Sequence, residues 1–105
     1  MILSSNGQNI YPEELESKLN NLQYIMESVV VERDRRLVAL VYPDYEKLDN
    51  EQIQKEDIPN IMEMNRTHVN KMLAMFEQIK KIELHPTEFE KTPKNSIKRY
   101  LYMNA

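Results

Sequence analysis

The stretch "YIMESVVVERDRRLVALVYPD", residues 24–44, decides the fold because it combines two β-branched runs with a polar turn. Val29, Val30 and Val31 form the first run, and residues 37–41 form the second. Asp34 and Arg35 stand between them, so the stretch predicts a β-hairpin. The runs are nearly continuous rather than alternating, which predicts strands buried on both faces. Pro43 offers no donor to a sheet and should end the second strand.

Further elements are predicted on both sides of this hairpin. Upstream, Asn6-Gly7 separates the apolar pairs 2–3 and 10–11, a pattern typical of a small β-hairpin. Pro12 then suits the first position of a helix that reaches about residues 21–22. Downstream, a short polar helix is predicted over 45–56, a longer helix over 58–79 and a third strand around residues 81–84. We therefore predict an α+β domain of two layers, with a mixed sheet of about three strands plus an N-terminal β-hairpin, packed against two to three helices.

Charge is distributed unevenly along the 105 residues, a length that suits one domain. All 17 acidic residues lie within residues 1–90, whereas Lys91, Lys94, Lys98 and Arg99 follow Glu90, and the formal net charge is −3. An acidic chain is not a general nucleic-acid binder, so this basic segment predicts a local anion site. The absence of cysteine and of a long apolar run favours a cytoplasmic protein, with peripheral contact to a membrane left open.

Several kinds of chemistry find no support in the residues. A single glycine excludes a phosphate-binding P-loop, and the two histidines, His68 and His85, are too few for a predicted metal site. The carboxylates of residues 13, 14 and 16 are interpreted as a solvated helix face beside the positive end of the helix dipole. Methionines 62, 64, 72 and 75 are interpreted as core filling, with a partner groove as the alternative.

Three motifs in order suggest a family. "SSNGQNIYPEELE" (residues 4–16), the strand pair ending in Val-Tyr-Pro-Asp, and "EFEKTPKNSIKRYLY" (residues 88–102) together resemble the carboxy-terminal domain of the adenylate-forming enzymes. This family contains acyl- and aryl-CoA synthetases and luciferases, and the likeness is nearest to long-chain fatty-acid CoA ligases. The resemblance implies that residues 1–105 are a mobile lid domain cut from a longer enzyme, whose N-terminal domain binds ATP with Mg²⁺ and a fatty or other carboxylic acid. It implies an acid–thiol ligase in which the lid closes for adenylation and then rotates to form a tunnel for CoA, and in which the isolated fragment is inactive.

Family resemblance also assigns roles to residues. The family pattern Thr-x-x-Gly-Lys-Ile-x-Arg places Asn95 at the glycine and Ser96 at the catalytic lysine, so the expected lysine is absent. Three hypotheses follow: Lys94 substitutes, Lys98 substitutes, or adenylation is weak. Asn95 and Lys98 are the predicted contacts to adenylate or phosphate, and Ser5, Asn6 and Gly7 are the predicted contributors to the CoA tunnel.

Two alternatives remain open at this stage. The basic segment and the Asn6-Gly7 turn can each be purely structural, the cations forming a solvated surface and the glycine an ordinary turn. The whole chain can also be a regulatory module that binds nucleotide or an acyl carrier without catalysis, which Ser96 favours.

Overall fold

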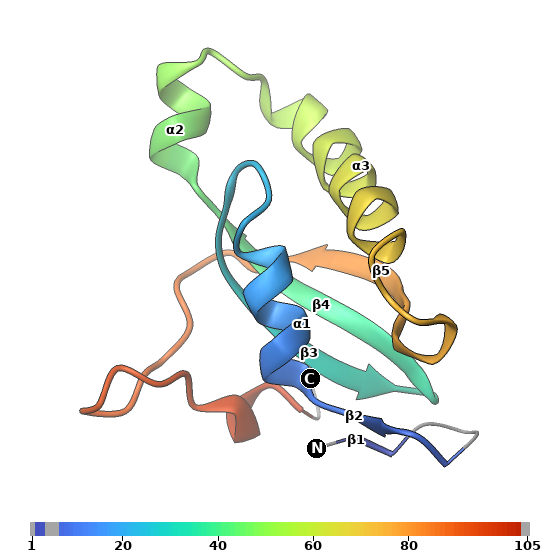
Figure 1. The fold of residues 1–105 in the computed structure, drawn as a ribbon. Helices are drawn as coiled ribbons and strands as arrows, with labels where there is room; N and C mark the ends of the chain where they lie inside the picture. The colour runs from blue at the N-terminus through green and yellow to red at the C-terminus, as the bar shows by residue number, and fades with distance from the viewer. Residues whose placement is uncertain (1, 4–6, 104–105) are drawn as a thin grey trace.

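A computed structural model describes residues 2–3 and 7–103 of the chain. Its strands are β1 (Ile2–Leu3), β2 (Asn9–Ile10), β3 (Ile25–Arg33), β4 (Arg36–Pro43) and β5 (Ile79–Leu84). Its α-helices are α1 (Pro12–Leu19), α2 (Tyr45–Asn50) and α3 (Ile58–Asn70), and short 3₁₀ helices are η1 (Lys55–Asp57), η2 (Met75–Glu77) and η3 (Arg99–Leu101). Figure 1 shows the arrangement of these elements.

The central element is a three-stranded mixed sheet in the order β3-β4-β5. β3 and β4 form the predicted antiparallel hairpin, whose two turn residues, Asp34 and Arg35, have positive φ values of 51° and 64°. Two successive left-handed residues give a tight turn whose twist matches that of the strands. β5 lies parallel to β4 on its other side. The predicted α+β class and mixed sheet are confirmed.

One face of the sheet is covered by α1 and α3. Val30, Ala39 and Val41 point into this layer and are at most 1% exposed. They pack with apolar side chains from the helices, the connections and β5, among them Leu15, Leu19, Leu48, Ile58, Met62, Val69 and Ile79. This layer is the main core of the domain.

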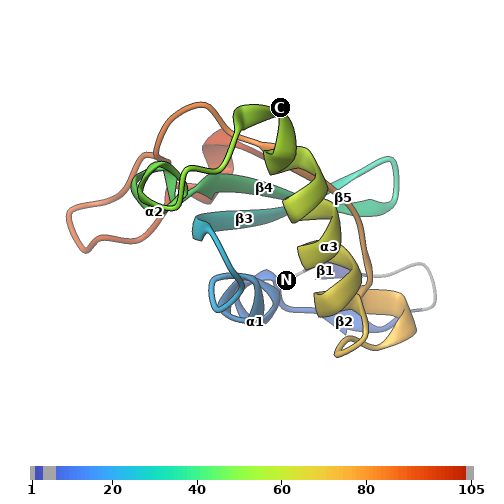
Figure 2. The ribbon, with the colours of Figure 1, turned by 90° about the horizontal axis from the view of Figure 1, so that it is seen from above.

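The other face is covered by the C-terminal segment that follows β5. Val29, Val31, Val38 and Leu40 contact Phe89 and Tyr102 in a second apolar cluster, and Figure 2 shows this segment across the sheet from α1. The rings of Phe89 and Tyr102 meet edge to face, with centroids 4.9 Å apart. The continuous valine runs are thus buried on both faces, as predicted, although helices cover only one of them.

The long predicted helix is wrong in its second half. Residues 58–79 were expected to be one helix, but α3 ends at Asn70 and β5 begins at Ile79. The Asn70 side chain accepts a hydrogen bond from the Ile79 amide at 2.8 Å and donates one to the Ile79 carbonyl at 2.9 Å. These two hydrogen bonds between the end of α3 and the start of β5 are tertiary contacts, so the local spacing of apolar residues could not predict them.

Two other predictions need correction. The polar helix expected over 45–56 is only six residues long, and Asp44 caps it by accepting a hydrogen bond from the Lys47 amide. Of the methionines interpreted as core filling, only Met62 is buried, whereas Met64, Met72 and Met75 are 72%, 51% and 84% exposed. Helical spacing does not distinguish a methionine on the buried face from one at its border.

The N-terminal hairpin is confirmed by the pairing of β1 with β2, in which Ile2 lies opposite Ile10. Gly7 lies in the connection and has φ +82°. Ser5 and Asn6 lie outside the described residues. Because Ile10 is 2% exposed and belongs to the main core, the hairpin is fixed to the domain at its second strand.

Candidate functional site

The predicted anion site is a tight turn, residues 91–98, which we call the basic turn. Its two sides meet at an antiparallel bridge between Lys91 and Ile97. The Thr92 amide donates to the Ser96 carbonyl at 2.7 Å, and the Ser96 amide donates to the Thr92 hydroxyl at 3.3 Å. The tip is therefore closed by its own hydrogen bonds and holds Lys94 and Ser96 in solvent. Because the backbone of the tip is already ordered, little conformational entropy would be lost when Lys94 binds an anion.

Asn95 supplies the backbone geometry of this tip. Its φ is +65°, in the left-handed region, and its amide donates to the Thr92 carbonyl at 2.8 Å. Asparagine is among the few non-glycine residues that adopt this conformation readily. The structure thus gives a physical reason for asparagine at this position, while its contact with adenylate remains a prediction.

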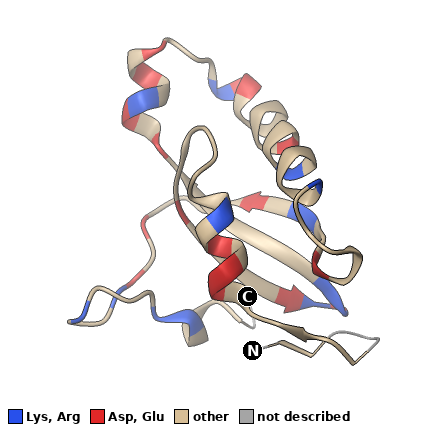
Figure 3. Ribbon diagram, viewed as in Figure 1, with Lys and Arg blue, Asp and Glu red and all other residues tan. Residues whose placement is uncertain are grey.

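The four cations of the C-terminal segment fall into two classes. Lys91 pairs with Glu27 at 2.5 Å, and Arg99 pairs with Glu16. Lys94 and Lys98, within the described part of the chain, have neither an ion pair nor a side-chain hydrogen bond. Figure 3 shows how few acidic residues lie along this part of the ribbon. Only two of the four cations are therefore free to meet an external anion.

The directions of the pKa shifts of Lys91 and Arg99 support this division into paired and free cations. The hydrogen bond to Glu27 raises the pKa of Lys91 and outweighs the opposing effect of burial. The hydrogen bond to Glu16 likewise raises the pKa of Arg99, against the effect of its partial burial. Both groups are held in their charged forms by internal carboxylates. They are structural cations rather than candidates for ligand binding.

Glu16 is the residue near the site whose environment the sequence analysis misjudged. It was expected on a solvated face with Glu13 and Glu14, but it is only 8% exposed. Its Oε2 accepts a hydrogen bond from the Val30 amide at 2.7 Å, and its Oε1 accepts one from Arg99 Nη2 at 2.7 Å. The available indication was its position, since residue 16 lies between Leu15 and Leu19 on the buried side of α1.

Gly7 forms part of a second candidate site, away from the basic turn. Among the residues that the structure describes, none has an atom within 4 Å of a Cβ built on Gly7, so the positive φ rather than crowding explains the glycine. The glycine hairpin is defined here by β1, Gly7 and β2. Its two strands and the tip of the basic turn lie toward opposite sides of the domain in Figures 1 and 2.

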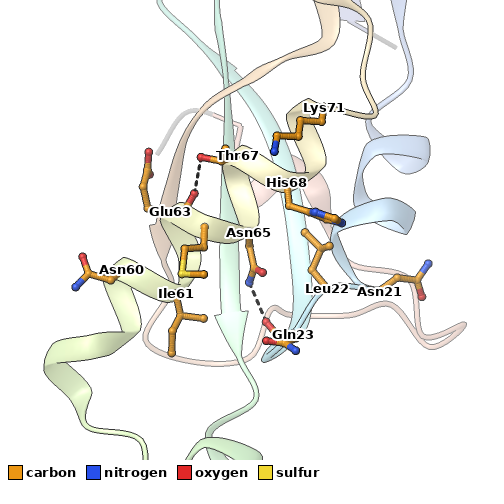
Figure 4. A pocket seen from close by; sticks show the side chains of 11 residues that line it. Asn21, Leu22, Gln23, Asn60, Ile61, Glu63, Asn65, Thr67, His68 and Lys71 are labelled. Atoms are coloured by element: carbon orange, nitrogen blue, oxygen red, sulfur yellow. Dashed lines mark hydrogen bonds between the residues drawn. The ribbon is translucent and has the colours of Figure 1, made fainter.

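A groove of about 880 Å³ lies between α3 and the connection from α1 to β3. Asn65 borders it and donates to the Gln23 carbonyl at 2.8 Å, while Thr67 donates to the Glu63 carbonyl, as Figure 4 shows. Its lining comes from residues 21–23 and 60–71. The groove is thus separate from both predicted sites.

Comparison with known families identifies the domain. The whole chain, residues 1–105, matches the AMP-binding enzyme C-terminal domain. The chain belongs to this family. Among curated proteins no match was found.

Solved structures agree with the family assignment. An acyl-CoA synthetase from Brucella canis is 26% identical, with a TM-score of 0.74 over 99% of this chain and 18% of that chain. The adenylation domain of a carboxylate reductase from Mycobacterium chelonae is 15% identical, with a TM-score of 0.79 over 95% of this chain and 17% of that chain. A fatty acyl CoA synthetase from Mycobacterium tuberculosis is 20% identical, with a TM-score of 0.63 over 99% of this chain and 19% of that chain.

These relatives are much longer than the present chain, which spans less than a fifth of each. The carboxylate reductase domain and the Mycobacterium tuberculosis synthetase have less than 25% sequence identity to this chain, so they show that the fold is shared and nothing more. Within the described residues, no helix is long and apolar enough to cross a membrane. The role of each site residue remains a prediction.

Proposed function

We propose that this chain is the mobile C-terminal domain of an ATP-dependent acid–thiol ligase. It would act together with an N-terminal adenylation domain that binds ATP and a carboxylic acid, for which we propose a long-chain fatty acid. Family membership over residues 1–105 and the likeness to an acyl-CoA synthetase support the proposal. The acyl pocket would belong to the N-terminal domain, so the isolated chain is expected to have no turnover.

Adenylation is the step assigned to the basic turn. When a carboxylate attacks the α-phosphate of ATP, negative charge develops, and a cation in a water-poor site stabilises it. Lys94 is exposed at the tip, is free of internal carboxylates and precedes left-handed Asn95. This free cation on a closed turn is the observation that carries the proposal. Lys98 lies nearer the base of the turn and is partly buried, so we assign it a supporting contact.

Mg²⁺ bound to ATP is assigned to the N-terminal domain. Among residues 2–3 and 7–103, no group of three or more histidines or carboxylates is placed to hold a metal ion. The cations of the basic turn suit the phosphate oxygens instead. In this proposal, the chain contributes positive charge, which reaches the phosphates of ATP when the domain closes on the N-terminal domain.

Thioester formation is the step assigned to the glycine hairpin. After rotation, the open side of Gly7 would face the narrow pantetheine chain of CoA, with Ser5 and Asn6 beside it. Support comes from the positive φ of Gly7, from the absence of any described residue within 4 Å of a Cβ built there, and from the anchoring of β2 in the core. A lid that presents different surfaces in two orientations separates the two chemical steps.

A second function deserves testing because Ser96 stands at the position of the family lysine. Its side chain is exposed but carries no charge. A domain that binds nucleotide or an acyl carrier without catalysis would tolerate this residue. The two functions differ in whether Lys94 matters for pyrophosphate release.

The test uses the full-length enzyme and measures pyrophosphate release in the adenylation half-reaction. Lys94→Ala should slow this step by about a hundredfold, the size expected when one charge-stabilising group is removed. Lys55→Ala, an exposed lysine in η1, is the matched control and should leave the rate unchanged. A silent Lys94→Ala together with acceleration by Ser96→Lys would instead support the non-catalytic or weakly adenylating alternative.

A further inference from the structure

The basic turn is anchored at both of its sides, to β3 on one side and to α1 on the other. On the first side, Glu27 accepts a hydrogen bond from the Phe89 amide at 3.3 Å and pairs with Lys91 at 2.5 Å. On the second side, Arg99 donates to Glu16 through both terminal nitrogens. A turn held at two sides has a defined position relative to the sheet.

The Arg99–Glu16 anchor connects more elements than the Lys91–Glu27 anchor does. Glu27 belongs to β3, but Glu16 belongs to α1, which begins at Pro12, directly after β2 of the glycine hairpin. Arg99 also donates to the Val30 carbonyl at 3.5 Å, while Val30 donates to Glu16. One ion pair therefore joins the end of the basic turn, the middle of β3 and the helix that carries the glycine hairpin.

Burial makes this pair difficult to replace. Glu16 is 8% exposed and accepts hydrogen bonds from the Val30 amide and from Arg99. Removing Arg99 leaves a buried carboxylate without its cation, and such an uncompensated charge is strongly unfavourable. The chain would relieve it by moving α1 or by admitting water. Either movement shifts both candidate sites.

We propose that Arg99 and Glu16 are positioning residues that fix the basic turn and the glycine hairpin relative to each other. The inference rests on the proposed function, in which the two sites serve successive steps of one reaction. Neither residue touches the reacting atoms in this account. Loss of the pair should impair adenylation and thioester formation together, whereas loss of Lys94 should impair adenylation alone.

The first experiment concerns anchoring and needs no reaction. Amide hydrogen exchange is measured in this chain for Thr92 and Lys98, whose amides donate to Ser96 and Glu90. Arg99→Met should raise both exchange rates by at least about tenfold, because the turn opens locally. Unchanged exchange in this variant would overturn the inference.

Two further variants make the first experiment specific. Arg33→Met is the matched control, since Arg33 pairs with Glu83 at 2.8 Å and its side chain is 25% exposed against 27% for Arg99. It should leave exchange in the basic turn unchanged, and an equal rise in this control would count against the inference. Glu16→Gln retains hydrogen-bonding capacity, so it should remain folded and raise exchange less than Arg99→Met.

The second experiment measures both half-reactions in the full-length enzyme, at a temperature where circular dichroism shows each variant folded. Arg99→Met should lower kcat of both steps by about ten- to a hundredfold, the range expected for a small misplacement of catalytic groups. Arg99→Lys should recover part of the loss because it restores the charge without the two-nitrogen geometry. Loss in only one step would overturn the shared positioning role.

Failure of this inference can be distinguished from failure of the proposed function. If Lys94→Ala slows adenylation but Arg99→Met slows neither step, the function stands and the positioning role is wrong. If Lys94→Ala is silent and Ser96→Lys accelerates adenylation, the proposed role of the basic turn fails, and the exchange experiment still decides whether the pair anchors the turn.

Discussion

Phe89 offers the most direct test of how the C-terminal segment is attached to the sheet. It is 2% exposed and packs in the second apolar cluster, against valines of β3 and β4 and the ring of Tyr102. Phe89→Ala removes a buried aromatic ring, a change that typically costs about 3–5 kcal/mol. A domain of this length is stabilised by roughly 5–15 kcal/mol in total, so the loss would be a large share of its stability.

Urea denaturation of this chain, followed by far-ultraviolet circular dichroism, measures the effect. Phe76→Ala is the matched control because Phe76, the other phenylalanine, is only partly buried at the border of the main core. We expect Phe89→Ala to lower the free energy of unfolding by about 3–5 kcal/mol and Phe76→Ala to lower it by less. A loss below about 0.5 kcal/mol for Phe89→Ala, which is ordinary for a surface change, would refute the packing of this segment on the sheet.

Two more predictions concern the basic turn and the acid stability of the domain. Asn95→Val should destabilise the chain by about 1–2 kcal/mol, because a β-branched residue is strained at the observed φ of +65°. Asn95→Gly should cost much less, and equal urea midpoints for the two variants would show that the left-handed turn is not required. The hydrogen bond from Arg33 lowers the pKa of Glu83, so the stabilisation is present above the unfolded-state value of about 4.3 and is lost as pH falls through the folded-state pKa. Stability measured between neutral and acid pH should therefore fall less steeply below about pH 4.3 in Arg33→Met than in the unchanged chain, and parallel curves would contradict this cause.

The sheet could be predicted from sequence because its determinants are local. Val29, Val30 and Val31 indicate burial on both faces, and the turn at Asp34 and Arg35 separates the strands without ambiguity. What covers the second face could not be predicted in this way. Phe89 stands alone in a polar stretch, and only the folded chain shows that it packs on the sheet.

Long-range polar contacts account for the other errors. Asn70 ends α3 by bonding to both backbone groups of Ile79, although apolar spacing continues past it. Glu16 is buried because Arg99, far away in sequence, reaches it. In the candidate site, the charge pattern grouped four cations, and the family resemblance gave roles to Lys94 and Lys98 alone. The division into paired and free cations depends on Glu16 and Glu27, whose partners are set by tertiary structure.

The contacts of Val30 have a consequence for association between molecules. β3 is an outer strand of the sheet, and such strands expose backbone groups that can pair with a strand of another chain. At Val30 the amide is bonded to Glu16 and the carbonyl is in contact with Arg99. A foreign strand would have to displace a buried ion pair before it could add at this point. The same two side chains thus occupy the outer backbone groups of this valine-rich strand at Val30, where a strand of another chain would otherwise pair.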